Sequence, residues 1–290
     1  MWRVTTILSI QSSVAYGHVG NSAATFPLMR MGVEVWPVLT VHFSNHTGYG
    51  GWRGPLLLAS DVADVITGID ERGVLGRCDA VLSGYQGAED VGAVILDAVA
   101  LVKSRNPKAI YCCDPVMGDV GQGFYVRPGI PELMRNRVVP AADVITPNQF
   151  ELEFLTGQKT SSVSDVLDAA DAARRLGPGA VLVTSVRHHA APPETPETLD
   201  MIAVTAAGAW SVTTPRLPGT FTGAGDLTAA TFLAVLLESG DVATAVGQTA
   251  AVMYGVLKTT VDLGQAELQL VAAQEEIAHP SSHFEVTRLR

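Results

Sequence analysis

The sequence contains few cysteines and few basic residues. Its three cysteines, Cys78, Cys112 and Cys113, are odd in number and have no CxxC spacing, which argues against a disulfide framework and a structural zinc site. Lys and Arg number 19 against 29 Asp and Glu, so the formal net charge is -10. No run of Lys or Arg could follow a phosphate backbone, and we expect no nucleic-acid partner.

Long apolar runs are also missing. None is long and uniform enough to span a bilayer, and residues 1–11 contain no small-residue cleavage site of the kind found in signal peptides. We therefore expect a cytoplasmic protein without membrane contact. With 290 residues, of which 47% are hydrophobic and 17% charged, the chain can bury one large core. We expect a single domain over residues 1–290.

Apolar, β-branched runs alternate with helix-like stretches along much of the chain. The predicted strands are residues 4–10, 33–41, 79–85, 109–113, 144–146, 181–186, 201–205 and 210–213. The predicted helices are residues 21–31, 61–70 and 90–103, followed by three within 227–277. The polar residues 11–13 are assigned to a turn after the first strand. This alternation predicts an α/β fold with a mostly parallel sheet, whose ligands bind at the carboxyl ends of the strands.

A glycine-rich turn leads directly into an apolar helix late in the chain. The segment reads Gly219-Thr-Phe-Thr-Gly-Ala-Gly-Asp226, and Gly223 and Gly225 allow the backbone to approach a ligand closely. Unpaired N–H groups at a helix N-terminus form an anion site. Asp226 is either a carboxylate that stabilises the helix by about 0.5 to 1 kcal/mol or a base beside that site. The Walker motif GxxxxGK[ST] is absent.

Two further segments place polar residues after predicted strands. One is Asp114-Pro-Val-Met-Gly118, and the other is Thr146-Pro-Asn-Gln-Phe-Glu151. An Asp before Pro is often only a turn former. Asn148 and Glu151 also have the spacing of a helix capping box.

Together these motifs resemble those of the ribokinase-like superfamily. The resemblance implies a kinase in which Gly223, Ala224 and Gly225 hold the transferred phosphoryl group while Asp226 deprotonates the acceptor hydroxyl. It also implies Mg²⁺ bound by Asp114 and Glu151, partly through water, with ATP as the phosphate donor. The implied ATP-binding residues are Asp114, Thr146, Asn148, Glu151, Thr184, Ser185, Thr222 and Gly223.

The N-terminal half is similar to pyridoxal kinases in particular. The similar segments are Ser9-Ile-Gln-Ser12, Tyr16 to Ala24, Trp36-Pro-Val, Val41 to Tyr49, Trp52 and Leu82-Ser-Gly-Tyr85. Similarity covers nearly the whole chain and is weakest over residues 187–217, where the adenine contacts stay unassigned. The implied reaction is phosphorylation of the 5'-hydroxyl of pyridoxal, within vitamin B6 salvage.

The resemblance also implies a ring pocket. Ser12 would bind the pyridine nitrogen or the ring substituents, and Thr47 would bind the 3-hydroxyl region. A flat heteroaromatic ring suits apolar and aromatic walls, here Val19, Val41, Phe43, His46, Trp52 and Tyr85. Residues 119–125 would form a flap over the phosphates, with Gly121 and Gly123 as hinges and Tyr125 facing the reaction.

Two alternatives remain open at this point. A hydroxymethylpyrimidine kinase would share the late motifs, and a vitamer-binding protein without catalysis would share the pocket. The resemblance further suggests a homodimer and a requirement for K⁺. The pattern does not rank pyridoxal, pyridoxine and pyridoxamine as acceptors. Residues 188–197, rich in Pro, Ala and Thr, are predicted to form an exposed connection.

Overall fold

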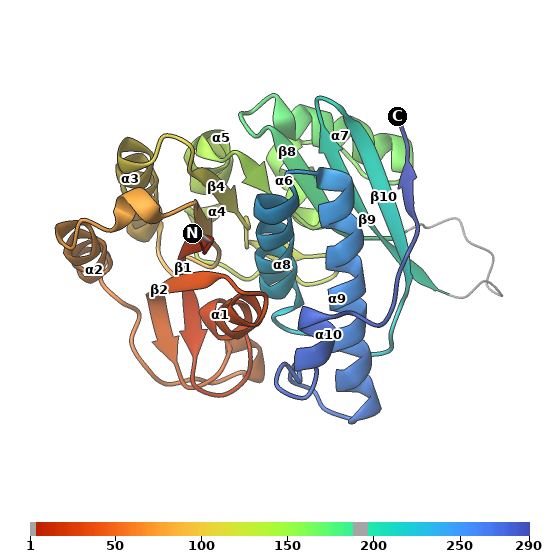
Figure 1. The fold of residues 1–290 in the computed structure, drawn as a ribbon, viewed down its shortest axis with the longest axis horizontal. Helices are drawn as coiled ribbons and strands as arrows, with labels where there is room; N and C mark the ends of the chain where they lie inside the picture. The colour runs from red at the N-terminus through yellow and green to blue at the C-terminus, as the bar shows by residue number, and fades with distance from the viewer. Residues whose placement is uncertain (1–3, 188–196) are drawn as a thin grey trace.

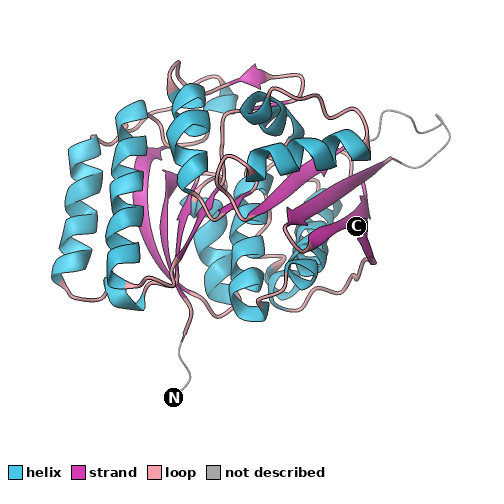
Figure 2. Ribbon diagram, turned by 90° about the horizontal axis from the view of Figure 1, so that it is seen from above, coloured by secondary structure: helices cyan, strands magenta, loops and turns pink. Residues whose placement is uncertain are grey.

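The computed structural model describes residues 4–187 and 197–290, in which nine strands form one sheet between two layers of helices (Figures 1 and 2). The strand order is β11-β10-β9-β8-β7-β4-β3-β1-β2. The strands are β1 (Thr6–Val14), β2 (Glu34–Phe43), β3 (Ala80–Ser83), β4 (Ile110–Cys113), β7 (Val144–Ile145), β8 (Ala180–Val186), β9 (Thr198–Thr205), β10 (Gly208–Pro215) and β11 (Val286–Arg288).

The six strands from β2 to β8 pair in parallel, and β9, β10 and β11 extend the sheet in antiparallel fashion. The predicted α/β fold with a mostly parallel sheet is confirmed. A second, two-stranded sheet consists of β5 (Gly118–Asp119) and β6 (Gly123–Phe124), which form a small hairpin within the predicted flap. Gly121 and Gly123 both have positive φ there, +83° and +72°, as the tight turn requires.

Each face of the large sheet has its own apolar layer. One face is covered by α1 (Asn21–Arg30), α8 (Ala224–Ser239) and α9 (Val242–Asp262), and α10 (Gln274–Ala278) packs against α9 and α1. The elements on the opposite face are α2 (Ala59–Glu71), η2 (Leu75–Arg77), α3 (Glu89–Arg105), α4 (Ile130–Leu133), η3 (Met134–Val138), α5 (Val139–Ala141), α6 (Gln149–Thr156) and α7 (Val163–Arg174). Cys112 and Cys113 are buried in different layers, which confirms that they point to opposite faces of β4.

Several boundaries differ from the sequence-based predictions. Residues 11–13 belong to β1 and not to a turn, because their polar side chains find partners inside the protein. Gln11 Nε2 donates to Ser9 Oγ at 2.9 Å, and the hydroxyls of Ser13 and Ser22 lie 3.1 Å apart. Helix α7 and strand β11 were not predicted. The predicted exposed connection lies mostly outside the described residues.

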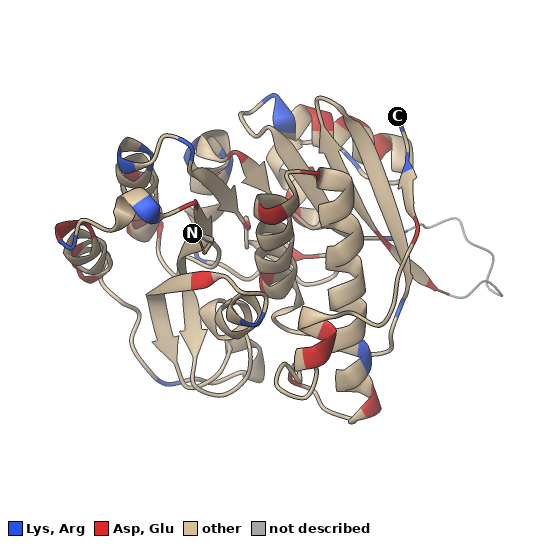
Figure 3. Cartoon of the chain, in the orientation of Figure 1, with Lys and Arg blue, Asp and Glu red and all other residues tan. Residues whose placement is uncertain are grey.

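The parallel strands deliver the predicted site residues to one end of the sheet. Ser12 lies near the end of β1, Val41 and Phe43 end β2, and Tyr85 follows β3. Asp114 directly follows β4. Lys and Arg are scattered over several elements instead of gathering on one face (Figure 3). Within the described residues, no helix is both long and apolar enough to cross a membrane.

Candidate active site

The glycine-rich turn lies against the segment that follows β1. Gly223, the residue before α8, has φ +86°, and a Cβ atom there would lie 1.7 Å from the carbonyl oxygen of His18. Only glycine fits this position without displacing the backbone. Thr222 precedes it in the turn, and the N-cap residue of α8 makes no side-chain cap, although the Ala224 N–H donates to the Phe221 carbonyl at 3.3 Å. A glycine-rich turn at a helix N-terminus is the usual form of an anion-binding site.

Asp226 lies in the first turn of α8 and is half-buried. Burial raises the pKa of its carboxyl group to about 6, while the N–H groups of Gly20 and of Asp226 itself oppose the rise. Gly20 is also packed against β1, because a Cβ atom there would lie 2.4 Å from Ser12 Oγ. The structure thus brings Asp226, Gly20 and Ser12 to one place.

Asp114 and Glu151 form an acidic pair beside this turn. Both are buried, and an added Cβ atom on Gly225 would lie 3.8 Å from Asp114 Oδ2. Burial, then the charges of Glu151 and Asp226, raise the pKa of Asp114 well above its usual range. Burial also raises the pKa of Glu151 to about 8. Burial of the hydroxyl and the charges of Glu151, Asp114 and Asp226 raise the pKa of Tyr125, although 47% of the residue is exposed; its place over the reaction stays a prediction.

The donor set fits a magnesium ion. Within residues 4–187 and 197–290, no group of three or more His, Cys, Asp or Glu side chains could enclose a metal. Two carboxylates crowded near a third repel one another, and a divalent cation would relieve that repulsion. Mg²⁺ commonly takes one or two carboxylates and completes its shell with water and substrate phosphates.

Asn148 and Glu151 do form the capping box that the sequence left as an alternative. The Asn148 side chain accepts from Glu151 N–H at 2.9 Å, and Glu151 Oε2 accepts from Asn148 N–H at 2.9 Å. Asn148 Nδ2 also donates to the Gly118 carbonyl at 2.8 Å, and Glu151 Oε1 accepts from Met117 N–H at 2.9 Å. The same two side chains therefore begin α6 and anchor the base of the β5-β6 hairpin.

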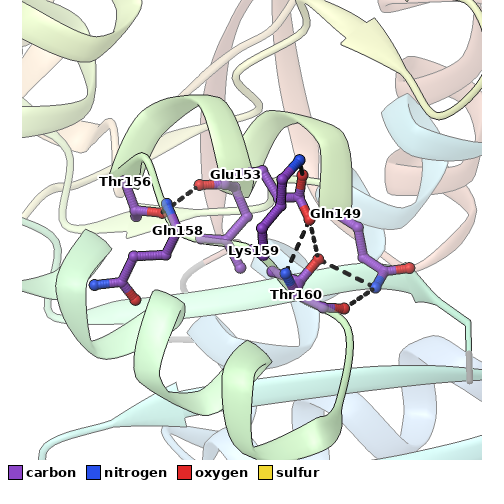
Figure 4. Close-up of polar contacts among 7 residues, drawn as sticks. Gln149, Glu153, Thr156, Gln158, Lys159 and Thr160 are labelled. Carbon is purple, nitrogen blue, oxygen red and sulfur yellow. Dashed lines mark hydrogen bonds and ion pairs between the residues drawn. The ribbon is translucent and has the colours of Figure 1, made fainter.

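The rest of α6 is fixed by contacts along its length (Figure 4). Gln149 Nε2 donates to the Thr160 carbonyl at 3.0 Å, and Glu153 Oε1 accepts from Thr160 N–H at 2.8 Å. Lys159 Nζ pairs with Glu153 Oε2 at 2.9 Å. These contacts join the helix to the segment that follows it.

The end of β8 lies beside the start of α6. Asn148 and Thr184 form an isolated parallel bridge, and Thr184 N–H donates to the Pro147 carbonyl at 2.9 Å. The adjacent Ser185 has φ +54°, the one positive value among the described non-glycine residues. Such a conformation costs energy and is common at ligand sites. Thr184 and Ser185 therefore lie beside Asn148, and their contact with ATP stays a prediction.

Some residues of the predicted ring pocket lie close to one another. Val41 is buried, and the rings of Phe43 and Trp52 lie 5.9 Å apart. An added Cβ atom on Gly87 would contact both Val41 and Tyr85, so these two side chains share one wall. Val19 is half-buried in the segment after β1. Thr47 and Trp52 are exposed on the segment after β2.

His46 has a partner that the residue pattern did not indicate. Its Nε2 lies 3.4 Å from Glu267 Oε1, although the two residues are far apart in sequence. Glu267 was not predicted, because no motif surrounds it. Gly20 and His18 were likewise not predicted to shape the site.

Comparisons with known proteins agree with this geometry. The family model described as phosphomethylpyrimidine kinase matches residues 73–270. The pyridoxal kinase PdxY of Rubrobacter xylanophilus is 59% identical over 283 residues, covering 98% of this chain and 97% of that protein. Its counterpart in Leifsonia xyli is 56% identical, covering 98% and 99%.

Solved structures show the same relationship. The pyridoxal kinase of Leishmania donovani in complex with ADP and pyridoxine has a TM-score of 0.90 and 30% identity, covering 98% of this chain and 99% of that one. Pyridoxal kinase from Trypanosoma brucei has a TM-score of 0.86 and 29% identity over the full length of both chains. The chain therefore belongs to the pyridoxal kinase family and has its ribokinase-like fold.

Proposed function

We propose that the protein transfers the γ-phosphoryl group of MgATP to the 5'-hydroxyl of pyridoxal, giving pyridoxal 5'-phosphate for vitamin B6 salvage. The observation that carries the proposal is the position of Asp226, between the glycine-rich turn and the ring-pocket residue Ser12. Two of the Leishmania donovani structures are named as complexes of ADP with pyridoxine or pyridoxamine. In the proposed reaction ADP is what remains of the donor after the transfer, and a vitamer of this kind is the acceptor.

Asp226 acts as the base in this proposal. Its pKa of about 6 keeps it mostly ionised at neutral pH, yet basic enough to accept the proton of the attacking hydroxyl. The N–H groups of Gly223, Ala224 and Gly225 stabilise the charge on the transferring phosphoryl group. Ser12 and Thr47 orient the ring, and Tyr125 closes the flap over the phosphates.

Asp114 and Glu151 would hold the Mg²⁺ ion, which neutralises phosphate charge when bound. Thr146, Asn148, Thr184, Ser185 and Thr222 would contact the nucleotide. K⁺ as a second ion, a homodimer, a cytoplasmic location and one kinase domain over residues 1–290 complete the proposal, all by resemblance and composition.

Asp226→Asn tests the central assignment. It should lower kcat for pyridoxal by roughly 10² to 10⁴ fold, because a positioned general base contributes about that much. The melting temperature should not fall, since a buried charge is removed. Asp262→Asn is the control, because Asp262 is an exposed partner of Lys258 at the end of α9. If Asp226→Asn has the same kcat as the parent protein, Asp226 is not the catalytic base.

A hydroxymethylpyrimidine kinase activity is the second candidate, since the matched family model carries the phosphomethylpyrimidine kinase description. That match begins at residue 73, after Ser12, Val41, Phe43 and Thr47, so it covers the late motifs and only part of the ring pocket. Side-by-side kcat/KM values for pyridoxal and hydroxymethylpyrimidine, with and without K⁺, separate the two. ATP consumption with pyridoxal present separates either kinase from a protein that only binds the vitamer.

A further inference from the structure

One buried carboxylate joins three segments that are distant in sequence. Glu267 lies in the segment after α9 and is only 8% exposed. Its Oε2 accepts from His18 N–H at 3.1 Å, and its Oε1 accepts from the Tyr49 hydroxyl at 2.7 Å. Oε1 also lies 3.4 Å from His46 Nε2. Glu267 thus contacts both the segment after β1 and the segment after β2.

On the β2 side, Glu267 holds the short helix η1 (Thr47–Tyr49) at both ends. His46 Nδ1 accepts from Gly48 N–H at 3.2 Å, so in the neutral ring the proton resides on Nε2, which faces Glu267. The His46 and Tyr49 rings lie 4.5 Å apart. Thr47, which we expect to bind the 3-hydroxyl region of the ring, lies between these two residues and is therefore placed by them.

On the β1 side, the same carboxylate reaches the anion site. A Cβ atom on Gly17, which has φ +91°, would lie 2.4 Å from Glu267 Oε2, so only glycine allows the carboxylate this close. The next residue, His18, places its carbonyl oxygen against Gly223. Leu268 Cδ1 would lie 3.4 Å from a Cβ atom on Gly223. The segment bearing Glu267 therefore packs directly beneath the phosphoryl-binding turn.

We propose that Glu267 is a positioning residue, which fixes the acceptor-binding segment His46–Tyr49 relative to the phosphoryl-binding turn at Gly223. The inference rests on the proposed function. Glu267 contacts neither reactant in this scheme. It acts on the acceptor-binding segment through Tyr49 and His46, so loss of the Tyr49 contact alone should disturb the acceptor and not the nucleotide.

The test compares Glu267→Gln, Glu267→Ala and Tyr49→Phe with the parent. KM for pyridoxal should rise roughly 10-fold or more in Glu267→Ala and less in Glu267→Gln, as expected for losing hydrogen bonds to a charged acceptor. In Tyr49→Phe, KM for ATP should stay within about twofold, since the Tyr49 contact lies on the acceptor side. Tyr49→Phe should also raise KM for pyridoxal. The double variant Tyr49→Phe/Glu267→Ala should have the same KM for pyridoxal as Glu267→Ala alone, because both substitutions remove the same contact. Glu275→Gln is the control, because Glu275 is an exposed partner of Arg30.

A measurement without substrate completes the test. Amide hydrogen exchange over residues 44–53 should be several-fold faster in Tyr49→Phe and Glu267→Gln than in the parent or in Glu275→Gln. Unchanged exchange and unchanged KM for pyridoxal in Tyr49→Phe would overturn the inference, as would an equal rise in both KM values. If the parent protein fails to phosphorylate pyridoxal, the proposed function is refuted. The amide hydrogen exchange of residues 44–53 would still test the role of Glu267 in that case.

Discussion

Gly223→Ala should abolish most activity while leaving the protein folded. The new methyl group would start 1.7 Å from the His18 carbonyl oxygen, whereas ordinary contact begins at 3.4 Å. The turn and the segment after β1 must therefore separate by about 1.7 Å. A misplacement of about 1 Å can cost roughly 10² fold in rate, so kcat should fall by at least that factor.

The positive φ of +86° adds a second cost. An L-residue in the left-handed region loses about 1 to 2 kcal/mol relative to glycine. Gly240→Ala isolates this cost, since Gly240 ends the same helix with φ +66° and a Cβ atom there meets nothing within 4 Å. Both variants should lose stability, but only Gly223→Ala should also lose kcat.

A coupled ADP-release assay with pyridoxal gives kcat, and urea unfolding gives the free energy of unfolding for both variants. The reasoning is refuted if Gly223→Ala keeps the kcat of the parent, or if Gly240→Ala loses as much kcat as Gly223→Ala. In the first case the turn does not bind the phosphoryl group. In the second case general instability explains the loss.

Two further predictions follow from the acidic cluster and the capping box. Because the folded pKa values of Asp226 and Glu151 are raised to about 6 and about 8, the folded protein binds more protons than the unfolded chain between about pH 4 and pH 8. The melting temperature of metal-free protein should therefore fall between pH 6 and pH 8. In Glu151→Gln this dependence of the melting temperature on pH should be weaker. A melting temperature that rises over this pH range would contradict the assigned burial. Asn148→Ala should cost about 1 kcal/mol in urea unfolding. It should raise KM for ATP more than KM for pyridoxal, since the flap base at Gly118 loses its donor.

The sequence predicted the fold well where the apolar pattern is regular. The strand and helix alternation over residues 33–113 agrees with the structure to within about two residues at most boundaries, because each buried strand is a continuous apolar run. The prediction was wrong at residues 11–13, because the polar side chains of Gln11 and Ser13 form hydrogen bonds inside the protein with Ser9 and Ser22. Helix α7 was detectable, since Ser162 and Asp165 form a capping box at its start.

The site residues too could be predicted where a local motif contains them, and could not be predicted elsewhere. Asp114, Glu151 and Asp226 belong to local motifs, and the structure brings all three together. Glu267 has no such motif, because its partners His18 and Tyr49 are 249 and 218 residues away in sequence. Contacts over such separations depend on how β1, β2 and α9 pack, and no local pattern encodes that packing.

The buried cysteines have a consequence for a substrate that carries an aldehyde. Thiolates add to aldehydes, but burial raises the pKa of Cys78 to about 11, that of Cys113 to about 12 and that of Cys112 well above its usual range. These sulfurs therefore stay protonated and enclosed at neutral pH. Pyridoxal and its phosphate should enter and leave as free aldehydes, without a hemithioacetal slowing turnover.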